Sequence, residues 1–483
     1  MKHSITAASL ALQVTSALAS QLLPVQIRAP TVEHFEAIVA NETYDFGCRP
    51  VAHPTEDGQY KLHALLTRDQ IDYLSAEYRE VDSIEIRETK LTKRAANAPI
   101  GSGDRFSSGS VAPLGLGTKA TGTTIASILN VNEINSAVTG LVNAYPGAFF
   151  KYDLPNKSFQ GRTSVAFYTG AGSSVNNYRL YLSAAMHARE RGGPDNVIYW
   201  VADLLQANKT GVGLKYGSKS YTNAQVKSVL NAGIVIFPLV NPDGVVYDQS
   251  SGSLWRKNRN TKSGSSGSSV GVDINRNFNF LWNFKKFFTS SASPASTSPS
   301  SEAFYGTAAE SEPETKNHVS IYSKFPKIRW FMDVHSAAGT LLYSWGDDEN
   351  QSTTPAMNFL NSTYDGKRGK VGDTTYKEYI PSADQTAIKT VADATVAAMR
   401  AVGSRSYTSQ QAVGLYPTSG ASDDYAFSRF WAQPGVNKVY GYTMEFGYST
   451  NFYPTLTEFN QNILDTNAGF MDWALTAISV GLE

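Results

Sequence analysis

The order of apolar and polar positions predicts an α/β domain from about residue 120 onward. Compact apolar runs are typical of buried strands, and apolar residues repeated every three or four positions are typical of helices. The apolar runs predict strands over residues 178–186, 233–240, 328–334 and 441–444, and helical spacing predicts helices over 195–206, 384–402 and 461–478. Strands that alternate with helices in this way indicate an α/β fold.

Polar residues that can carry chemistry stand at the carboxyl ends of these expected strands. The first strand leads into His187, the third into His335 and the fourth into Glu445, while the second leads into a turn at Asn241-Pro-Asp-Gly244. Ligands of open α/β sheets bind beyond the carboxyl ends of the strands. We therefore expect the functional site at this edge of the sheet.

Residues 20–94 carry a second pattern, in which acidic residues outnumber basic ones. Helical spacing covers residues 32–39 and 67–78, and alternating positions predict strands over 60–65 and 84–86. The segment ends at the basic pair Lys93-Arg94, ahead of a Gly/Ser-rich stretch. Exposed basic pairs in such linkers invite proteolysis, although two ordinary surface cations are the alternative. We expect a small α+β unit at 20–94, a linker at 95–119 and the main domain at 120–483.

The first residues resemble a secretory signal. Lys2 and His3 precede a largely apolar stretch up to Leu18, and small residues at Ala17 and Ala19 favour cleavage before Ser20. A buried core helix is the alternative. We expect residues 1–19 to be a signal peptide and the protein to be secreted. Five N-x-S/T sequons agree with secretion, at Asn41, Asn156, Asn208, Asn350 and Asn361.

Composition narrows the possible partners. The chain of 483 residues has 42 basic and 42 acidic residues, so nothing in its charge suggests a nucleic-acid or acidic-membrane partner. No stretch reaches the 18 apolar residues that a membrane helix needs. Cys48 is the only cysteine, so no disulfide can form within the chain. A large core and a bound metal would then have to stabilise a secreted protein.

Histidine is scarce, with seven residues in the chain, and two of them stand beside charged residues in a pattern that suits a metal. His187 and Glu190 are three positions apart, a spacing that lets both side chains face one ion, and His335 ends a neighbouring strand. A catalytic zinc site needs three protein ligands and one open position for water. A hydrogen-bonded structural histidine is the alternative for either residue alone. His318 lies in a polar helical stretch, which predicts a solvated surface position.

Six motifs then point to a known family. They are His187-Ala-Arg-Glu190, Leu254-Trp-Arg-Lys-Asn-Arg259, Asp273-Ile-Asn-Arg-Asn-Phe278, Asp333-Val-His-Ser336, Tyr416-Pro-Thr-Ser-Gly-Ala-Ser-Asp-Asp424 and Thr443-Met-Glu445. In this order, residues 120–483 closely resemble the zinc metallocarboxypeptidases of the carboxypeptidase A/B type (funnelins), and residues 20–94 resemble their activation segment. The resemblance implies a mixed, mostly parallel twisted sheet flanked by helices, one Zn²⁺ per chain, and synthesis as an inactive precursor.

The resemblance also implies a role for each catalytic residue. His187, Glu190 and His335 match the zinc ligands, and Asp273 matches the carboxylate that orients the first histidine. Zinc lowers the pKa of bound water to about 7 and polarises a carbonyl. Glu445 matches the general base, which passes a proton from water to the leaving amine. The remaining match, Arg256, implies stabilisation of the oxyanion together with zinc.

An exopeptidase must also recognise a free carboxylate. Arg276 matches the guanidinium that binds it through two parallel hydrogen bonds, with Asn275 and the Tyr416 hydroxyl beside it. Arg189 matches a contact further along the peptide. Ala337 stands where the pancreatic enzymes carry an aromatic residue, so we expect one subsite to be more open.

The specificity pocket leaves two alternatives. Asp423 matches the main specificity position and Gly346 the second one, which leaves room for a side chain. A carboxylate at the base of the pocket resembles the B-type enzymes, which act on C-terminal Lys or Arg. Apolar or small residues complete the expected wall, at Leu342, Leu415 and Thr443. If Asp423 turns outward into a hydrogen bond instead, the pocket is A-type or mixed.

We therefore expect a secreted, monomeric zinc carboxypeptidase. Its expected partners are peptides or proteins with a free C-terminus and its own propeptide, which acts as an inhibitor. One alternative is a zinc amidase or deacylase on the same fold, which the intact carboxylate-binding residues disfavour. Another is a non-catalytic peptide-binding protein, which Glu445 disfavours. A serine hydrolase is disfavoured because histidines, which would have to supply its base, are scarce in this chain.

Overall fold

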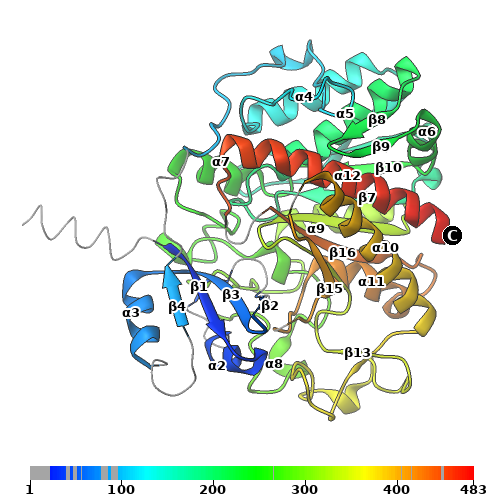
Figure 1. Cartoon of the computed structure of the whole chain (residues 1–483). Helices are drawn as coiled ribbons and strands as arrows, with labels where there is room; N and C mark the ends of the chain where they lie inside the picture. The colour runs from blue at the N-terminus through cyan, green and yellow to red at the C-terminus, as the bar shows by residue number, and fades with distance from the viewer. Residues whose placement is uncertain are drawn as a thin grey trace, which may run out of the picture.

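The computed structural model shows a small N-terminal unit beside a much larger α/β unit (Figure 1). It describes residues 22–39, 44–46, 50, 52–55, 57–77, 85–88, 96–264, 266–403, 405–414, 416–447 and 451–483. The expected signal peptide and the pair Lys93-Arg94 lie outside the described residues. Among the described helices, none has the length and apolar character of a membrane span.

The N-terminal unit is a four-stranded antiparallel sheet with short helices. The strand order is β2 (Ala52–Pro54), β3 (Tyr60–Leu66), β1 (Leu23–Ala29) and β4 (Glu85–Glu88). The helical elements are η1 (Val32–Phe35), α2 (Glu36–Val39) and α3 (Arg68–Glu77). Alternate residues of β1, such as Val25 and Ile27, are buried in a core of their own with Leu62. The expected helices and the strand at 60–65 are confirmed, whereas β1 and β2 were not anticipated.

The large unit is built on an eight-stranded mixed sheet. Its strand order is β15 (Thr408–Gln411), β12 (Thr340–Tyr343), β16 (Tyr440–Phe446), β11 (Trp330–Ser336), β7 (Leu180–Ala184), β10 (Ile234–Phe237), β6 (Thr163–Thr169) and β5 (Phe149–Lys157). The central strands β16, β11, β7 and β10 are parallel, while β12 and β6 pair with them in the antiparallel sense. The expected mixed, mostly parallel sheet flanked by helices is confirmed.

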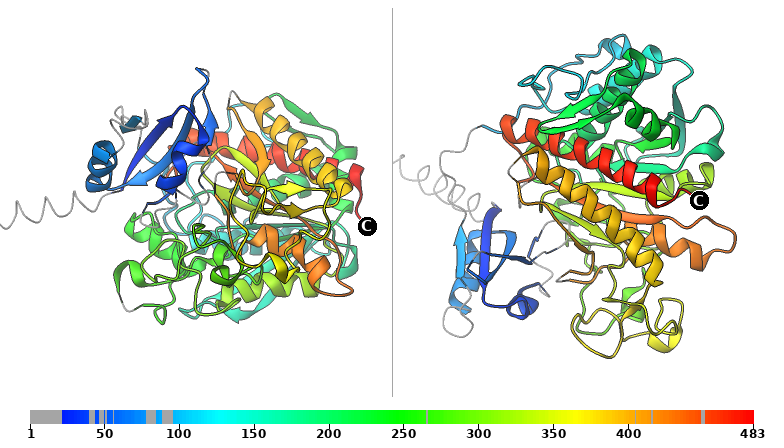
Figure 2. Two further views of the ribbon diagram at one scale, coloured as in Figure 1. Left: turned by 90° about the horizontal axis from the view of Figure 1, so that it is seen from below. Right: turned by 45° about the vertical axis from the view of Figure 1, so that its right-hand side comes forward.

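Helices cover the sheet and complete its core. They are α4 (Val131–Ala144), α5 (Gly193–Thr210), α6 (Asn223–Asn231), α7 (Pro242–Ser251), α8 (Phe284–Phe287), α9 (Pro313–Lys324), α10 (Ser382–Val402), α11 (Ser422–Ala432) and α12 (Leu456–Val480). Two small strand pairs lie outside the main sheet, β8 (Leu214–Tyr216) with β9 (Lys219–Tyr221) and β13 (Asn350–Gln351) with β14 (Glu378–Tyr379). Figure 2 shows the two longest helices, α10 and α12, side by side.

Several element boundaries differ from the expectation. The strand β7 ends at Ala184, so His187 lies in the following loop. The expected turn at 241–244 is instead the first turn of α7, because the Asn241 side chain accepts a hydrogen bond of 2.9 Å from the Gly244 amide and Pro242 occupies the first helical position. Proline suits that position since its missing N–H would have no helical partner.

The surface position expected for His318 is wrong. The ring lies on the buried side of α9 with no exposed surface, and it contacts the aromatic rings of Tyr181, Phe278, Tyr322 and Phe331. Burial lowers the pKa of His318 to about 4, so the imidazole is neutral at pH 7. The polar stretch around it is itself mostly buried, since Glu314, Thr315 and Asn317 are buried with it and only Lys316 is exposed.

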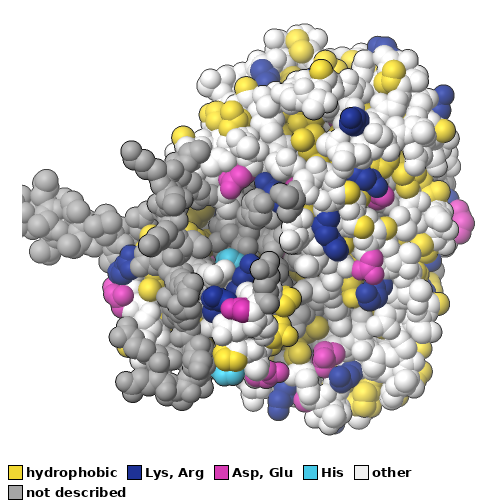
Figure 3. Space-filling view, in the orientation of Figure 1, with side chains coloured by type: hydrophobic (Ala, Val, Ile, Leu, Met, Phe, Trp, Pro, Cys, Tyr) yellow, Lys and Arg dark blue, Asp and Glu magenta, His cyan; other side chains and the backbone are white. Residues whose placement is uncertain are grey.

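Residues 96–119, which the sequence predicts to be a linker, pack on the large unit. Phe106 and Leu116 are buried in its core, and the Gly117 amide donates a hydrogen bond of 2.8 Å to Asp203 on α5. Basic and acidic side chains are interspersed over the face seen in Figure 3, in keeping with the formal net charge of zero.

Candidate metal and substrate site

Three side chains from two strand ends converge on one point. His187 and Glu190 lie in the loop after β7, and His335 is the penultimate residue of β11. The Nδ1 atoms of His187 and His335 are 2.8 and 2.9 Å from the two carboxylate oxygens of Glu190. All three side chains are buried. The structure thus brings together the three residues that the sequence predicts to bind zinc.

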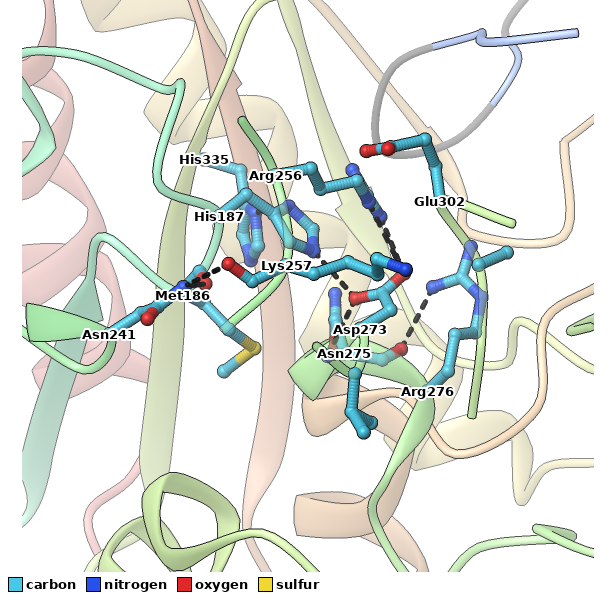
Figure 4. Close-up of polar contacts among 12 residues, drawn as sticks. Met186, His187, Asn241, Arg256, Lys257, Asp273, Asn275, Arg276, Glu302 and His335 are labelled. Atoms are coloured by element: carbon cyan, nitrogen blue, oxygen red, sulfur yellow. Dashed lines mark hydrogen bonds and ion pairs between the residues drawn. The ribbon is translucent and has the colours of Figure 1, made fainter. Parts of the chain in front are cut away.

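The loop that carries His187 and Glu190 is held by its neighbours. The Asn241 side-chain amide donates to the backbone carbonyls of Met186 and Lys257 over 3.2 and 3.1 Å (Figure 4). The Ala188 amide donates to the Arg256 carbonyl over 3.0 Å. Asn241 is the N-cap of α7. One buried asparagine therefore ties the loop both to a helix and to the segment that presents Arg256.

A carboxylate stands behind each imidazole. Asp273 Oδ1 is 2.9 Å from His187 Nε2, and Asp333 Oδ2 is 2.9 Å from His335 Nε2. A carboxylate at this distance favours the tautomer that keeps its proton on Nε2 and leaves the lone pair on Nδ1, where it can bind a metal. Sequence reasoning anticipated Asp273 and missed Asp333. Asp333 could have been found from its position two residues before His335, because side chains at i and i+2 of a strand face the same side of the sheet.

The donor set fits a cation. With Nε2 protonated in both rings, two Nδ1 lone pairs face each other over 3.0 Å, next to the Glu190 carboxylate. Two imidazoles and one carboxylate are typical ligands of a catalytic zinc ion with an open position. His187, Glu190 and His335 are the only group of this kind among the described residues.

Arg256 and Glu445 flank the three ligands. Arg256 Nη2 donates to Asp273 Oδ2 over 2.8 Å, and its Nη1 lies 3.9 Å from Glu190. Burial alone would raise the pKa of Asp273, but Arg256 and His187 hold it well below its usual value. Glu445 pairs with His335 in the parallel register of β11 and β16, which places both side chains on one face of the sheet.

Two of the expected carboxylate-binding residues, Arg276 and Tyr416, line a small cavity beside Arg256. Asn275 and Arg276 belong to the short helix η5 (Ile274–Arg276), directly after Asp273. The Asn275 side-chain oxygen accepts a hydrogen bond of 2.8 Å from the Ser422 amide. Arg256, Arg276 and Tyr416 line a cavity of about 70 Å³, whose other wall comes from residues of the N-terminal unit, Val39, Tyr44, Asp45, Phe46 and Pro50.

The N-terminal unit covers this side of the large unit. Asp45 forms a buried ion pair with Arg189, with oxygen–nitrogen distances of 2.5 and 2.8 Å. Leu65 of β3 packs in a buried apolar cluster with Ala337 and Phe452. Tyr416 packs against the core of the N-terminal unit. The sequence predicts an open subsite beside Ala337, and here Leu65 of the N-terminal unit packs against that residue.

Asp423 lies at the start of α11 and is fully buried. Its Oδ2 accepts a hydrogen bond of 3.0 Å from the Thr443 hydroxyl, and its Oδ1 accepts one of 3.0 Å from the Asp424 amide. The carboxylate of Asp424 accepts from the Gly346 amide. The structure thus groups Asp423, Thr443 and Gly346, three of the residues expected at the specificity pocket, while Leu415 lies outside the described residues.

A buried His-Glu-His cluster at the carboxyl edge of a mixed α/β sheet, with an adjacent glutamate and arginine, defines a metal-dependent hydrolase site. Residues 134–469 match the zinc carboxypeptidase family, so the chain belongs to that family. The resemblance found in the sequence is confirmed.

Individual relatives agree with this assignment. Carboxypeptidase A2 from Rattus norvegicus is 32% identical over 219 residues, which are 45% of this chain and 46% of that protein. Carboxypeptidase B from Bos taurus is 26% identical over 280 residues, covering 56% and 53%. The chain thus spans about half the length of the curated relatives that it matches.

Solved structures share the fold at low sequence identity. Thrombin activatable fibrinolysis inhibitor superposes with a TM-score of 0.62 at 18% identity, over 95% of this chain and 99% of that one. Carboxypeptidase A from Helicoverpa armigera gives a TM-score of 0.62 at 17% identity, over 96% and 99%. These likenesses extend over nearly the whole chain, including the N-terminal unit.

Proposed function

We propose that this protein is a zinc-dependent exopeptidase that hydrolyses the C-terminal peptide bond of peptides and proteins. The convergence of His187, Glu190 and His335 beside Glu445 carries the proposal. A zinc ion held there would polarise the scissile carbonyl and activate water. The family assignment and the order of the motifs along the chain support the same reaction.

Each neighbouring side chain has a defined task in this reaction. Glu445 takes the proton of the attacking water and returns it to the leaving amine. Arg256, held by Asp273, is the cation that stabilises the oxyanion of the tetrahedral intermediate. Arg276 binds the terminal carboxylate through its guanidinium, with Asn275 and Tyr416 beside it. Binding of the carboxylate is what restricts cleavage to the last peptide bond.

The first test uses blocked dipeptides that end in Arg or Phe, with and without a chelator. We expect hydrolysis of free-carboxylate substrates that stops when the metal is removed and returns when zinc is added. The matched control is the same substrate with an amidated C-terminus, which cannot bind Arg276. Equal rates on the amidated substrate would identify an amidase instead, and no hydrolysis by the processed, zinc-loaded protein would favour a binding protein.

We propose that the enzyme prefers substrates with a basic C-terminal residue, or accepts both basic and hydrophobic ones. If Asp423 binds the substrate side chain, Lys or Arg gains a charge-assisted hydrogen bond that contributes about 1.5–3 kcal/mol. At about 1.4 kcal/mol per decade, Arg is then favoured over Phe by roughly tenfold to a hundredfold in kcat/KM. Asp423→Ile should reverse this order. If the parent prefers Phe and the substitution changes little, Asp423 serves only the hydrogen bonds to Thr443 and Asp424.

We further propose that residues 20–94 inhibit the enzyme until they are removed near Arg94. The ion pair between Asp45 and Arg189 and the contact of Leu65 with Ala337 support this role, because both occupy positions beside the expected substrate site. A substrate chain and the N-terminal unit cannot contact Arg189 at the same time.

Cleavage of the precursor should therefore raise its activity on a small substrate. Asp45→Asn should raise the activity of the uncleaved precursor as well, because it removes the closer carboxylate partner of the buried Arg189 and leaves only Glu302, at 3.7 Å. The matched control is Asp57→Asn, since Asp57 is an exposed residue of the same unit that pairs with Arg28. Equal rates for intact and cleaved forms would contradict inhibition.

Secretion also remains a proposal, drawn from the expected signal peptide. One sequon is well placed to carry a glycan, because Asn208 is exposed at the end of α5. In contrast, the Asn156 side chain forms a hydrogen bond of 3.1 Å with Asn317, and the Asn350 side chain donates to the Ser344 carbonyl over 3.2 Å. Asn41 lies outside the described residues.

A further inference from the structure

Asp333 is a buried carboxylate at the centre of the sheet, two residues before the expected metal ligand His335. Its side chain has no exposed surface. Three groups surround it: the Ser183 hydroxyl donates to Oδ1 over 2.7 Å, the Ser422 hydroxyl donates to Oδ2 over 2.7 Å, and His335 Nε2 is 2.9 Å from Oδ2. A buried charge is costly unless hydrogen bonds satisfy it. The two hydroxyl hydrogen bonds therefore offset the cost of burying the Asp333 charge.

Three separate elements fix the position of the carboxylate. Asp333 on β11 is directly opposite Ser183 on β7 in the parallel register, so both side chains lie on one face of the sheet. Ser422 approaches from the first residue of α11. The neutral ring of His318, whose Nε2 is 3.4 Å from the Ser183 hydroxyl, closes the far side together with its aromatic neighbours. The carboxylate therefore has little freedom to move away from His335.

The same arrangement occurs on the other imidazole, where Asp273 faces His187. The two carboxylates differ in their other partners, because Asp273 also binds Arg256, whereas Asp333 accepts from two serine hydroxyls. Asp273 thus links the metal site to the residue expected to stabilise the oxyanion. Asp333 contacts two serine hydroxyls and the His335 ring, so its only link to the metal site is through His335.

We propose that Asp333 is a positioning residue for His335, held by Ser183 and Ser422, that keeps the imidazole in the tautomer with its proton on Nε2 and its lone pair on Nδ1. This role rests on the proposed function, since it presumes that the cluster binds zinc. Partners of this kind typically change metal affinity by 10–100-fold when they are removed.

The test is the zinc dissociation constant of the full-length protein, measured by competition with a chromogenic chelator. Asp333→Asn retains the shape of the side chain but loses its charge, so we expect zinc to bind about 10–100-fold more weakly. The matched control is Asp203→Asn, because Asp203 is equally buried and bonds the Gly117 amide and the Tyr216 hydroxyl, not a metal ligand. This control should bind zinc as the parent does.

Two further readouts separate positioning from a purely structural role. The visible spectrum of the cobalt-substituted protein should change in Asp333→Asn and stay unchanged in Asp203→Asn. Melting of the metal-free proteins should show that Asp333→Asn is folded. If it does not fold, Ser422→Ala removes one hydrogen bond and leaves the carboxylate, and it should weaken zinc binding by a smaller factor.

The outcomes separate the two proposals. If the parent binds no zinc, the proposed function fails and the role of Asp333 fails with it. If the parent binds zinc and Asp333→Asn, or Ser422→Ala in its place, binds it equally tightly, only the positioning role is overturned. The same holds if Asp203→Asn weakens binding as much as Asp333→Asn does.

Discussion

Replacing Glu445 by glutamine should lower kcat by about 10²–10⁴-fold or more while leaving zinc content and fold unchanged. Glutamine has nearly the same shape as glutamate but cannot take a proton from water at neutral pH. The position favours a direct role, because Glu445 is buried next to His335 on the adjacent parallel strand. The measurement is steady-state kinetics on a blocked dipeptide, together with zinc analysis of the same sample.

Glu314→Gln is a matched control for this substitution. Glu314 is also buried, on α9, where it accepts a hydrogen bond from Asn258. Burial raises its pKa to about 8, so the side chain is largely neutral at pH 7 and glutamine changes little. We expect near-parent turnover from Glu314→Gln. Near-parent turnover from Glu445→Gln would mean that another group takes the proton.

Removing His335 should abolish zinc binding. His335→Ala leaves His187 and Glu190 as the only protein ligands, and a catalytic zinc site normally has three. The substitution also exposes the Asp333 carboxylate to a cavity, since it loses its contact with Nε2. We expect elemental analysis after dialysis to fall from one zinc per chain to nearly none, and activity to disappear with it.

The control for this prediction is His34→Ala. His34 lies in η1 of the N-terminal unit, where its Nδ1 contacts the Thr31 hydroxyl, so its loss should leave zinc content at one per chain. Full retention of zinc by His335→Ala would remove that residue from the metal site and leave the family assignment in place.

Much of the sheet could be predicted because its central strands are buried on both faces. A strand such as β7, in which all five residues are buried, appears in the sequence as an apolar run interrupted only by Ser183. The strand β1 of the N-terminal unit was missed because only one of its faces is buried and Gln26 and Arg28 interrupt the apolar positions. His318 was misplaced because its neighbours Glu314, Thr315 and Asn317 are polar yet buried, so the polar stretch did not mark a solvated position.

The candidate site was predictable to a similar degree. His187 and Glu190 stand close together in the sequence, and an imidazole three positions from a carboxylate is a typical pair of metal ligands, so the metal site could be predicted. Asp45 and Leu65 gave no comparable signal, because their contacts with Arg189 and Ala337 join segments more than a hundred residues apart and depend on how the two units pack. Their roles, like those of Arg276 and Tyr416, stay predictions until the variants are measured.

The contact between Leu65 and Ala337 makes the fit of the two units depend on the sizes of these two side chains. Where relatives carry an aromatic residue at the position of Ala337, the space that Leu65 enters here would already be filled. A leucine in one unit and an alanine in the other are thus complementary in size across this contact. An N-terminal unit that carries a residue smaller than leucine at this place would leave a cavity beside Ala337 and lose part of this buried apolar contact.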